Sequence, residues 1–266
     1  MASVNPLLEL WRSGKPSLGG WLTTADPQIV EYLASCGFDE VCIDQQHGMA
    51  DGALLAGCFR AIELHGVAPT TRVPANDFAE IGHALDVGAV AIVVPMVSTA
   101  EEAAHAAAAC HYPPRGGRSV GPLRGSLARA SKRLEGLDDA ACVVMIETPE
   151  GLANVDAIAA TPGVDALYIG PGDLGLGLGM SAWPEDWTDD QAKTHREAIA
   201  TILAACRQHG VTPGIHTGNG ATARRYLDQG FLYLTVANEL GLITIGGRAE
   251  LAVARGTGTA AEAAVI

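Results

Sequence analysis

The chain has 266 residues, of which 48% are hydrophobic and only 5% aromatic, and it contains 32 glycines. This length fits one large α/β barrel or two small domains, and either can bury a sizeable core. The formal net charge of −13 at pH 7 argues against nucleic acid and anionic membranes as partners. An acidic substrate then requires a cation or an arginine to supply local positive charge.

The six cysteines are scattered and form no C-x-x-C pair. Three disulfides remain formally open, but a chain of this length does not need them, and a thiol in an apolar stretch behaves as a small hydrophobe. Near the N-terminus Glu9 and Arg12 stand where a secretory signal is apolar. No stretch of about 18 apolar residues occurs, so we expect a cytoplasmic protein without a membrane span.

Short β-rich runs alternate with helical stretches along the chain. The predicted strands are Leu18–Thr24, Glu40–Gln45, Pro69–Val73, Ala91–Val97, Cys142–Thr148, Ala166–Gly170, Thr212–His216 and Tyr233–Ala237. Helical spacing between the strands predicts helices at Asp26–Cys36, Leu54–Leu64, Asp77–Asp86, Thr99–Cys110, Gln191–His209 and Ala221–Gln229. Eight strands that alternate with helices predict an α/β protein, a single (β/α)8 TIM barrel that forms one domain over residues 1–266.

A doubly wound sheet is the alternative architecture. Such a sheet usually has a G-x-G-x-x-G motif after its first strand, whereas Ala25, Asp26 and Pro27 stand there. The predicted strands are near-continuous apolar runs, which is typical of parallel strands buried on both faces. Two longer connections, residues 113–139 and 175–190, interrupt the alternation, and connections of this length are often functional.

Polar residues gather where the predicted strands end. Because a barrel builds its active site at the C-terminal ends of its strands, these positions are the candidate site. They are Asp44 near the end of the second strand and His47 after it, Arg72 near the end of the third, Glu147 near the end of the fifth, Asp173 after the sixth and His216 at the end of the seventh.

Glu147 and Asp173 follow consecutive strands, so their carboxylates are expected to converge over the barrel mouth. Two carboxylates without clustered cysteine or histidine suit a hard octahedral ion such as Mg²⁺ or Mn²⁺. The alternative is that each acid caps the following helix or pairs with an arginine. The glycine-rich Gly170–Leu174 segment also leaves backbone N–H groups open, and such groups can hold a carboxylate.

His47 is the candidate proton-transfer residue, because an imidazole titrates near neutral pH. Asp44 or Asp86 could orient it. Arg72 offers a planar fork that suits a carboxylate or an enolate oxygen, and its alternative role is a structural ion pair with Asp44 or Glu147.

The chain has three lysines, Lys15, Lys132 and Lys193, and none lies in a predicted strand. A Schiff-base aldolase needs a lysine desolvated in the barrel interior. If the protein is an aldolase, a metal ion must therefore stabilise the enolate.

An ordered set of motifs runs from Gly20 to about Ala237. It comprises Asp44–His47 (DQQH), Thr71–Pro74 (TRVP), Leu85–Ala89 (LDVGA), Pro95–Val97 (PMV), Tyr112–Gly116 (YPPRG), Met145–Thr148 (MIET) and Gly170–Leu174 (GPGDL). In these motifs the chain resembles the HpcH/HpaI aldolases, the metal-dependent pyruvate aldolases that include 4-hydroxy-2-oxoheptanedioate aldolase.

The resemblance implies an oxygen-bound divalent metal, Mg²⁺, Mn²⁺ or Co²⁺, with Glu147 and Asp173 as its ligands. Arg72 matches the arginine that binds pyruvate and steadies the enolate, and the backbone at Gly172 and Asp173 matches the segment that holds the pyruvate carboxylate. Members are oligomers, which implies a homo-oligomer here, a hexamer or trimer, with the last helix exchanged between neighbours.

For proton transfer the resemblance implies that His47 is the base, that Asp86 is its acid partner and that Asp44 is an acid near the site. The chain also departs from many members. Gln46 replaces a common Glu, as in a branch that acts on hydroxy-ketoacids, and Met145 stands where some members have Gln. His216 replaces an apolar residue, so the substrate-binding pocket for the aldehyde is expected to differ.

The predicted reaction is reversible cleavage of a 4-hydroxy-2-oxo acid to pyruvate, or hydroxypyruvate, and an aldehyde. One alternative is a CoA-ester lyase of the citrate lyase type, which needs a basic groove for the CoA phosphates. Five arginines of the first long connection are candidates for that groove: Arg115, Arg118, Arg124, Arg129 and Arg133. A barrel without catalysis is the other alternative, and a broken metal pair or a missing base would mark it.

Overall fold

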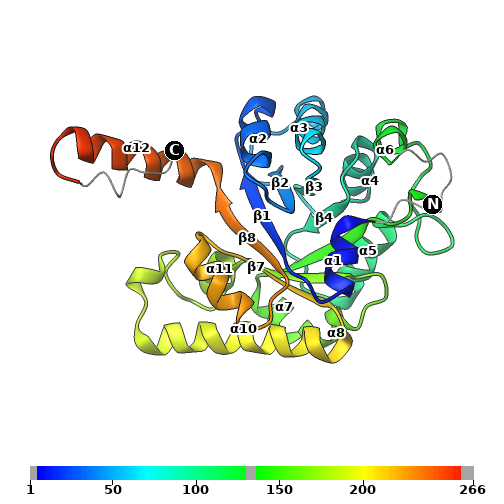
Figure 1. Ribbon diagram of the computed structural model, residues 1–266. Helices are drawn as coiled ribbons and strands as arrows, with labels where there is room; N and C mark the ends of the chain where they lie inside the picture. The colour runs from blue at the N-terminus through cyan, green and yellow to red at the C-terminus, as the bar shows by residue number, and fades with distance from the viewer. Residues whose placement is uncertain (1–4, 130–135, 259–266) are drawn as a thin grey trace.

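The computed structural model describes residues 5–129 and 136–258. Within these residues eight parallel strands pair in chain order and close into a barrel, which confirms the predicted (β/α)8 fold (Figure 1). The strands are β1 (Ser17–Leu22), β2 (Glu40–Asp44), β3 (Ala68–Arg72), β4 (Ala91–Val94), β5 (Ala141–Ile146), β6 (Ala166–Ile169), β7 (Thr212–His216) and β8 (Tyr233–Asn238).

Helices connect the strands and cover the outside of the barrel. They are α1 (Pro6–Arg12), α2 (Pro27–Ala34), α3 (Gly52–Leu64), α4 (Phe78–Val87), α5 (Ala100–Cys110), α6 (Leu123–Ala128), α7 (Pro149–Ala153), α8 (Val155–Ala159), α9 (Pro171–Gly177), the 3₁₀ turn η2 (Pro184–Asp186), α10 (Asp189–His209), α11 (Gly220–Leu227) and α12 (Glu239–Ala254). Six of them correspond to the predicted helices. In the described part of the chain, no helix is long and apolar enough to span a membrane.

Short polar residues begin most of the helices that follow a strand. The side chains of Asp26, Asp51 and Asp77 each accept hydrogen bonds from the first free backbone N–H groups of α2, α3 and α4. Thr99 and Thr188 form reciprocal capping boxes with the third residue of α5 and α10. These caps fix where each helix starts, and thereby the length of the loops at the C-terminal ends of the strands.

The barrel interior is a packed layer distinct from the layer between strands and helices. Trp21, Tyr168 and Tyr233 fill it together with small residues, and α1 closes the N-terminal end with Trp11. The rings of Trp11 and Tyr233 lie 5.1 Å apart, and the indole N–H of Trp11 donates to Ser17 Oγ at 2.9 Å. The interior is therefore filled below the site, and the open space lies at the opposite rim.

Glu40 is fully buried in this interior beside Gly19. A Cβ on Gly19 would lie 1.5 Å from Glu40 Oε1, so the glycine makes room for the carboxyl group. Thr70 Oγ1 donates to Glu40 Oε2, while Oε1 has no hydrogen-bond partner among the described residues. Burial raises the pKa of Glu40 from 4.5 to about 8, so the group is protonated at neutral pH.

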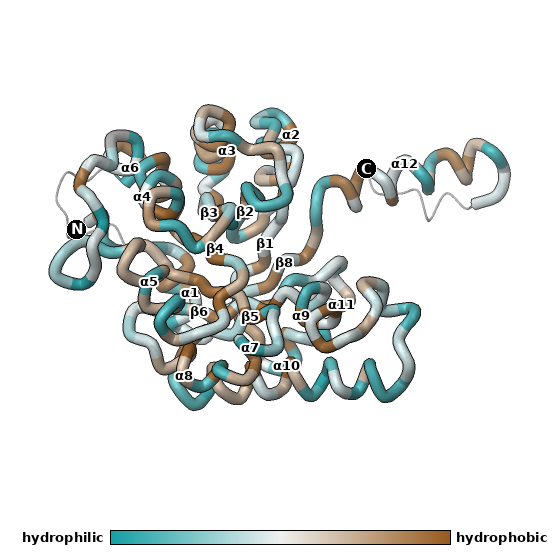
Figure 2. The backbone as a smooth tube through the Cα atoms, turned by 180° about the vertical axis from the view of Figure 1, so that it is seen from behind, coloured by the Kyte–Doolittle hydropathy of each residue, from teal (hydrophilic) through white to brown (hydrophobic). Residues whose placement is uncertain are grey.

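The last helix, α12, extends away from the barrel (Figures 1 and 2). Of its residues, Glu239 alone is buried. Apolar side chains along the rest of the helix are exposed, namely Leu240, Leu242, Ile243, Ile245 and Leu251. A helix with this much exposed apolar surface is expected to have a protein partner.

Replacing Glu40 with Gln is expected to stabilise the protein at alkaline pH but not at acidic pH. The folded chain keeps the proton up to about pH 8, whereas the unfolded chain releases it near 4.5, so the Glu40 contribution is present below 4.5 and lost as pH rises toward 8. The stability of Glu40→Gln relative to wild type should grow by a few kcal/mol from pH 5 to pH 8.5, measured by denaturant unfolding. A difference independent of pH would show that Glu40 is ionised when folded.

Candidate active site

A cavity of about 360 Å³ opens at the C-terminal ends of the strands. Its lining residues come from β1, β2, β3, β5, β7 and β8, from the loops after β1 and β2, from the β6–α9 connection and the start of α9, and from the start of α12. They are Trp21, Thr23, Asp44, His47, Arg72, Met145, Gly170, Pro171, Gly172, Asp173, His216, Asn238 and Leu240. Five of the six strand-end residues singled out in the sequence, Asp44, His47, Arg72, Asp173 and His216, thus share one cavity, whereas Glu147 does not line it.

Arg72, the last residue of β3, is fixed by Asp44 at the end of β2. Its Nε lies 2.9 Å from Asp44 Oδ1 and its Nη2 lies 2.5 Å from Asp44 Oδ2, so the pair is bidentate. The Trp21 ring lies 5.1 Å from the guanidinium carbon, and its N–H donates to Asp44 Oδ2 at 3.3 Å. Among the described residues Arg72 Nη1 has no partner, so one edge of the guanidinium faces the cavity free.

The charge of this pair is stable at neutral pH. Burial alone raises the pKa of Asp44, but the hydrogen bonds and the positive charge of Arg72 outweigh it and hold that pKa below its usual value. The alternative that we considered for Arg72, an ion pair with Asp44, is therefore present. It leaves the other edge of Arg72 available for an anionic substrate.

Glu147 directly follows β5, which ends one residue earlier, at Ile146. Its Oε1 accepts from the backbone N–H of Met96 at 2.8 Å. Its Oε2 is buried and has no partner among the described residues. Burial raises the pKa of Glu147, and the negative charge of Asp173 raises it further.

Two backbone features hold Glu147 in this position. Met96 has φ of 59°, a left-handed conformation that is strained for a residue with a Cβ, and it directs its N–H toward the carboxylate. Gly170 packs against the other side, where a Cβ would lie 2.4 Å from Glu147 Oε2. An alanine at position 170 would therefore push the carboxylate aside.

The turn that carries Asp173 begins α9. Gly170 is its N-cap without a side-chain cap, and Gly172 and Asp173 lie in the first turn, where backbone N–H groups lack intrahelical partners. His195 of α10 supports this turn, because its Nε2 lies 2.9 Å from the carbonyl oxygen of Pro171 and therefore carries the proton. His195 was not predicted, since a single histidine inside a helical stretch gives no signal of what it contacts.

The donor set fits a hard divalent ion. Glu147 Oε2 is a buried carboxylate oxygen without a partner, and the charge of Asp173 acts on it. No cluster of three or more His, Cys, Asp or Glu occurs in the described residues, so protein would supply only two carboxylates. Magnesium and manganese commonly bind in this way and take their other ligands from water and substrate.

His47 lies exposed at the rim of the cavity. Its backbone N–H lies 3.4 Å from Asp44 Oδ1, but its imidazole has no hydrogen-bond partner among the described residues. Asp44 instead directs its carboxylate to Arg72 and Trp21. The expectation that Asp44 orients the His47 ring is therefore corrected.

Asp86 also lies elsewhere than expected. It is the penultimate residue of α4, and a helix in a βα unit runs back toward the N-terminal ends of the strands, away from His47. Its carboxylate pairs with Arg118 Nη2 at 2.7 Å. A pairing of Asp86 with His47 is thus not formed within this chain.

His216, at the end of β7, stands edge-on to Trp21, with ring centroids 5.1 Å apart. Burial and the positive charge of Arg72 lower its pKa to about 4. The imidazole is therefore neutral at physiological pH and can both donate and accept a hydrogen bond. Arg72 therefore carries the positive charge of this contact, and the His216 ring adds none.

Lysine is absent from the described strands, as predicted. Lys15 and Lys193 are both exposed, and Lys193 lies 3.8 Å from Glu197. Lys132 falls outside the described residues. Nothing in the described barrel interior can form a Schiff base.

Sequence reasoning also missed Glu239, the first residue of α12. Its Oε1 accepts hydrogen bonds from the backbone N–H groups of Thr23 and Thr24, at 2.7 and 2.9 Å. Thr23 lines the cavity, so Glu239 ties the start of the last helix to the rim of the site. Its position after β8 gave no indication of this contact.

The fold and this cavity define a barrel whose rim site combines one free arginine edge with Asp173 and with Glu147, which is buried against Gly170. The chain belongs to the HpcH/HpaI aldolase/citrate lyase family, whose model matches residues 17–244. The family predicted from the motifs is thereby confirmed.

Two curated relatives cover nearly the whole chain. A hydroxypyruvate/pyruvate aldolase of Rhizorhabdus wittichii is 39% identical over 259 residues, which are 95% of this chain and 99% of the relative. A 4-hydroxy-2-oxo-heptane-1,7-dioate aldolase of Salmonella typhi is 36% identical over 252 residues, 92% of each chain. Both names agree with the predicted class of enzyme, a carbon–carbon lyase.

A solved structure is similar over the same extent. It is an HpcH/HpaI aldolase/citrate lyase family protein from Burkholderia cenocepacia J2315, with a TM-score of 0.86 and 32% identity. The match covers 95% of this chain and 100% of the other. The barrel described above is therefore the fold of the family.

Replacing Gly170 with Ala is expected to weaken Mn²⁺ binding at least about tenfold, because the new Cβ would displace the unpartnered oxygen of Glu147. Gly170 has φ of −90°, which alanine adopts without strain, so the fold should persist. Gly172→Ala is the matched control, since a Cβ there meets no atom within 4 Å. Equal Mn²⁺ affinity of the two variants in calorimetry would remove Glu147 from the metal site.

Proposed function

We propose that the protein is a divalent-metal-dependent aldolase that reversibly cleaves a 4-hydroxy-2-oxo acid to pyruvate, or hydroxypyruvate, and an aldehyde. The observation that carries the proposal is one cavity lined by Arg72, with its free edge, and by Asp173, where the buried and unpartnered Oε2 of Glu147 lies against the lining residue Gly170. The aldolase names of relatives that match the chain over nearly their full length support it.

Glu147 and Asp173 are the proposed ligands of Mg²⁺, Mn²⁺ or Co²⁺. When bound there, a divalent cation supplies positive charge beside the keto and carboxylate oxygens of the substrate. The contacts of Glu147 support this role, because one oxygen accepts the N–H of Met96 while the other has no partner among the described residues. Without a cation, the carboxylates of Glu147 and Asp173 would repel an acidic substrate.

Arg72 is the proposed group that binds the 2-oxo acid and steadies the enolate. Asp44 fixes the guanidinium plane through two bonds, so the free edge needs no reorganisation as negative charge develops on the substrate oxygen. The backbone N–H groups of Gly172 and Asp173 are proposed to hold the substrate carboxylate.

His47 is the proposed base. It removes the proton from the 4-hydroxyl group, the C3–C4 bond breaks, and its electron pair passes to C3 to form the enolate of pyruvate while the aldehyde leaves. The enolate then takes up a proton at C3. In the reverse direction the same groups form the carbon–carbon bond.

Arg72→Ala is expected to abolish the exchange of pyruvate C3 protons with solvent deuterium, because the enolate loses its fixed positive partner. His47→Ala should cut aldol cleavage by about 10²- to 10⁴-fold, the usual worth of a general base. The deuterium exchange is measured by NMR, and the aldol cleavage is measured by coupled pyruvate release. Exchange at the wild-type rate in Arg72→Ala would make Arg72 structural, and a loss under about twofold in His47→Ala would refute the base assignment.

We further propose a homo-oligomer, a hexamer or trimer, in which α12 packs against a second copy of the chain. Ile243 and Ile245 are 60% and 64% exposed on this helix, which supports a partner there. Because Asp86 does not reach His47 within one chain, the predicted pairing requires the Asp86 of a second copy. It stays a prediction about the assembly.

Ile243→Asp and Ile245→Asp are expected to dissociate the oligomer, because a charge at a buried apolar contact is costly. Light scattering after size-exclusion chromatography measures the mass. Tyr32→Asp, at a side chain that is 71% exposed on α2, is the control and should leave the mass unchanged. A monomeric wild-type protein would contradict the proposal.

The CoA-ester lyase alternative finds less support. Four of the five arginines expected to form a phosphate groove already engage acids: Arg115 with Asp138, Arg118 with Asp86, Arg124 with Glu63 and Arg129 with Asp139. Arg133 lies outside the described residues. The residues that a non-catalytic barrel would be expected to have lost, Glu147, Asp173, His47 and Arg72, are all retained.

A further inference from the structure

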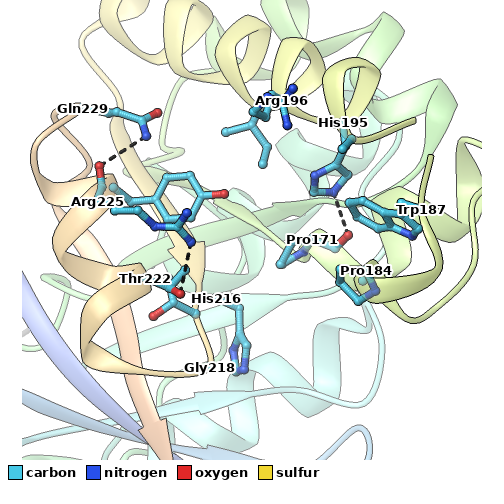
Figure 3. Close-up of a pocket in the computed structure, with 15 residues that line it drawn as sticks. Pro171, Pro184, Trp187, His195, Arg196, His216, Gly218, Thr222, Arg225 and Gln229 are labelled. Atoms are coloured by element: carbon cyan, nitrogen blue, oxygen red, sulfur yellow. Dashed lines mark hydrogen bonds between the residues drawn. The ribbon is translucent and has the colours of Figure 1, made fainter. Parts of the chain in front are cut away.

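Two side chains that do not line the candidate site hold its rim from opposite sides. On one side, His195 donates to the carbonyl oxygen of Pro171 at 2.9 Å and supports the turn that carries Asp173 (Figure 3). On the other side, Glu239 contacts the loop after β1. The contacts of Glu239 lead further, to the loop of the proposed base His47.

Glu239 is the first residue beyond the ladder between β1 and β8, which ends with Trp21 opposite Asn238. Its Oε1 accepts hydrogen bonds from the backbone N–H of Thr23 at 2.7 Å, the Thr23 hydroxyl at 3.0 Å and the backbone N–H of Thr24 at 2.9 Å. Its Oε2 is buried and has no partner among the described residues. The hydrogen bonds that this carboxylate accepts thus all come from the loop after β1.

This loop needs support because its backbone is strained. Ala25, which follows Thr24, is buried and has φ of 53°, a left-handed conformation that is unfavourable for a residue with a Cβ. Such a conformation persists only where the surrounding structure holds it. The three hydrogen bonds to Glu239 fix the two residues directly before Ala25.

The same loop holds the segment that carries His47. The carbonyl oxygen of Thr23 accepts the backbone N–H of Met49 at 2.8 Å. Gly48 packs so closely there that a Cβ would lie 2.8 Å from the carbonyl oxygen of Thr23 and 2.0 Å from that of Asp44. Because the imidazole of His47 has no hydrogen-bond partner among the described residues, these backbone contacts determine where it lies.

We propose that Glu239 is a positioning residue for aldol cleavage: it fixes the loop after β1 and, through the contact of Thr23 with Met49, places His47 at the rim of the site. The proposal rests on the proposed function, in which His47 is the base. Glu239 does not line the cavity, so it acts only through the backbone of the two loops.

The test compares Glu239→Met, Glu239→Gln and Asp77→Ala, each made in wild type and in His47→Ala. Methionine has nearly the length of glutamate but no oxygen, whereas glutamine keeps one oxygen that can accept the same hydrogen bonds. Asp77 is the matched control, because its carboxylate also accepts backbone N–H groups after a strand. Those groups belong to Ala79 and Glu80 of α4.

Glu239→Met should lower kcat for aldol cleavage at least about tenfold, because a misplaced catalytic group loses much of its effect. Glu239→Gln should stay within about threefold of wild type, since a neutral oxygen still accepts these bonds. Asp77→Ala should stay within about twofold, because loss of a helix cap costs stability rather than activity. In His47→Ala, Glu239→Met should cost less than about twofold more, because no imidazole remains to be positioned.

Amide hydrogen exchange tests the same contact without substrate. In Glu239→Met the Met49 amide should exchange at least about tenfold faster than in wild type, whereas the amides of α4 should be unchanged. Circular dichroism checks that the variant is folded. If Glu239→Met does not fold, Gly48→Ala takes its place, because the new Cβ would push the loop away from Thr23. The same dependence on His47 is then expected.

Equal losses from Glu239→Met in wild type and in His47→Ala would overturn the proposal, as would a Met49 amide that exchanges at the wild-type rate. A loss in Glu239→Gln as large as in Glu239→Met would also overturn it, because the acceptor oxygen would then have no role. Failure of the proposed function is distinguishable: wild type then does not cleave the substrate, or His47→Ala alone loses less than about twofold.

Discussion

The proposed chemistry of this protein depends on one buried carboxylate, of which only one oxygen has a hydrogen-bond partner among the described residues. Glu147 receives one backbone N–H from Met96, and its other oxygen is enclosed without a partner beside the charge of Asp173. An unpaired buried polar atom is costly, so its surroundings must be built to hold it. The left-handed backbone of Met96 and the missing Cβ of Gly170 do so. In the proposed function a hard cation would supply what this oxygen lacks, and the same cation would offset the charge of an acidic substrate.

Near that carboxylate, Arg72 pairs with Asp44 rather than with Glu147. Arg72 could neutralise Glu147, yet its bidentate contact to Asp44 turns one guanidinium edge away and leaves the other edge toward the cavity. In the proposed site, positive charge would come from two separate sources, the fixed Arg72 and a metal ion at Glu147 and Asp173. His216 adds bulk and hydrogen-bonding capacity without charge, because burial and Arg72 hold its pKa low.

The strands and the rim residues could be predicted because their signals are local. Buried parallel strands are continuous apolar runs, and each rim residue follows such a run, so Asp44, Arg72 and Asp173 converge once the barrel is recognised. The short helices α6 to α9 were not predicted, since one or two turns give too little periodicity. Contacts between distant segments were not predictable either. Asp86 pairs with Arg118 and His195 with the Pro171 carbonyl because of packing that no spacing encodes.

The claim that two acids from consecutive strands bind one cation is tested most directly by Mn²⁺ titration of wild type and Glu147→Gln, with and without pyruvate, followed by electron paramagnetic resonance. Glutamine keeps the shape and the Met96 contact but removes the charge. The account predicts that wild type binds Mn²⁺, that pyruvate tightens this binding, and that Glu147→Gln loses both effects. Binding of equal strength in Glu147→Gln, with the same response to pyruvate, would contradict it.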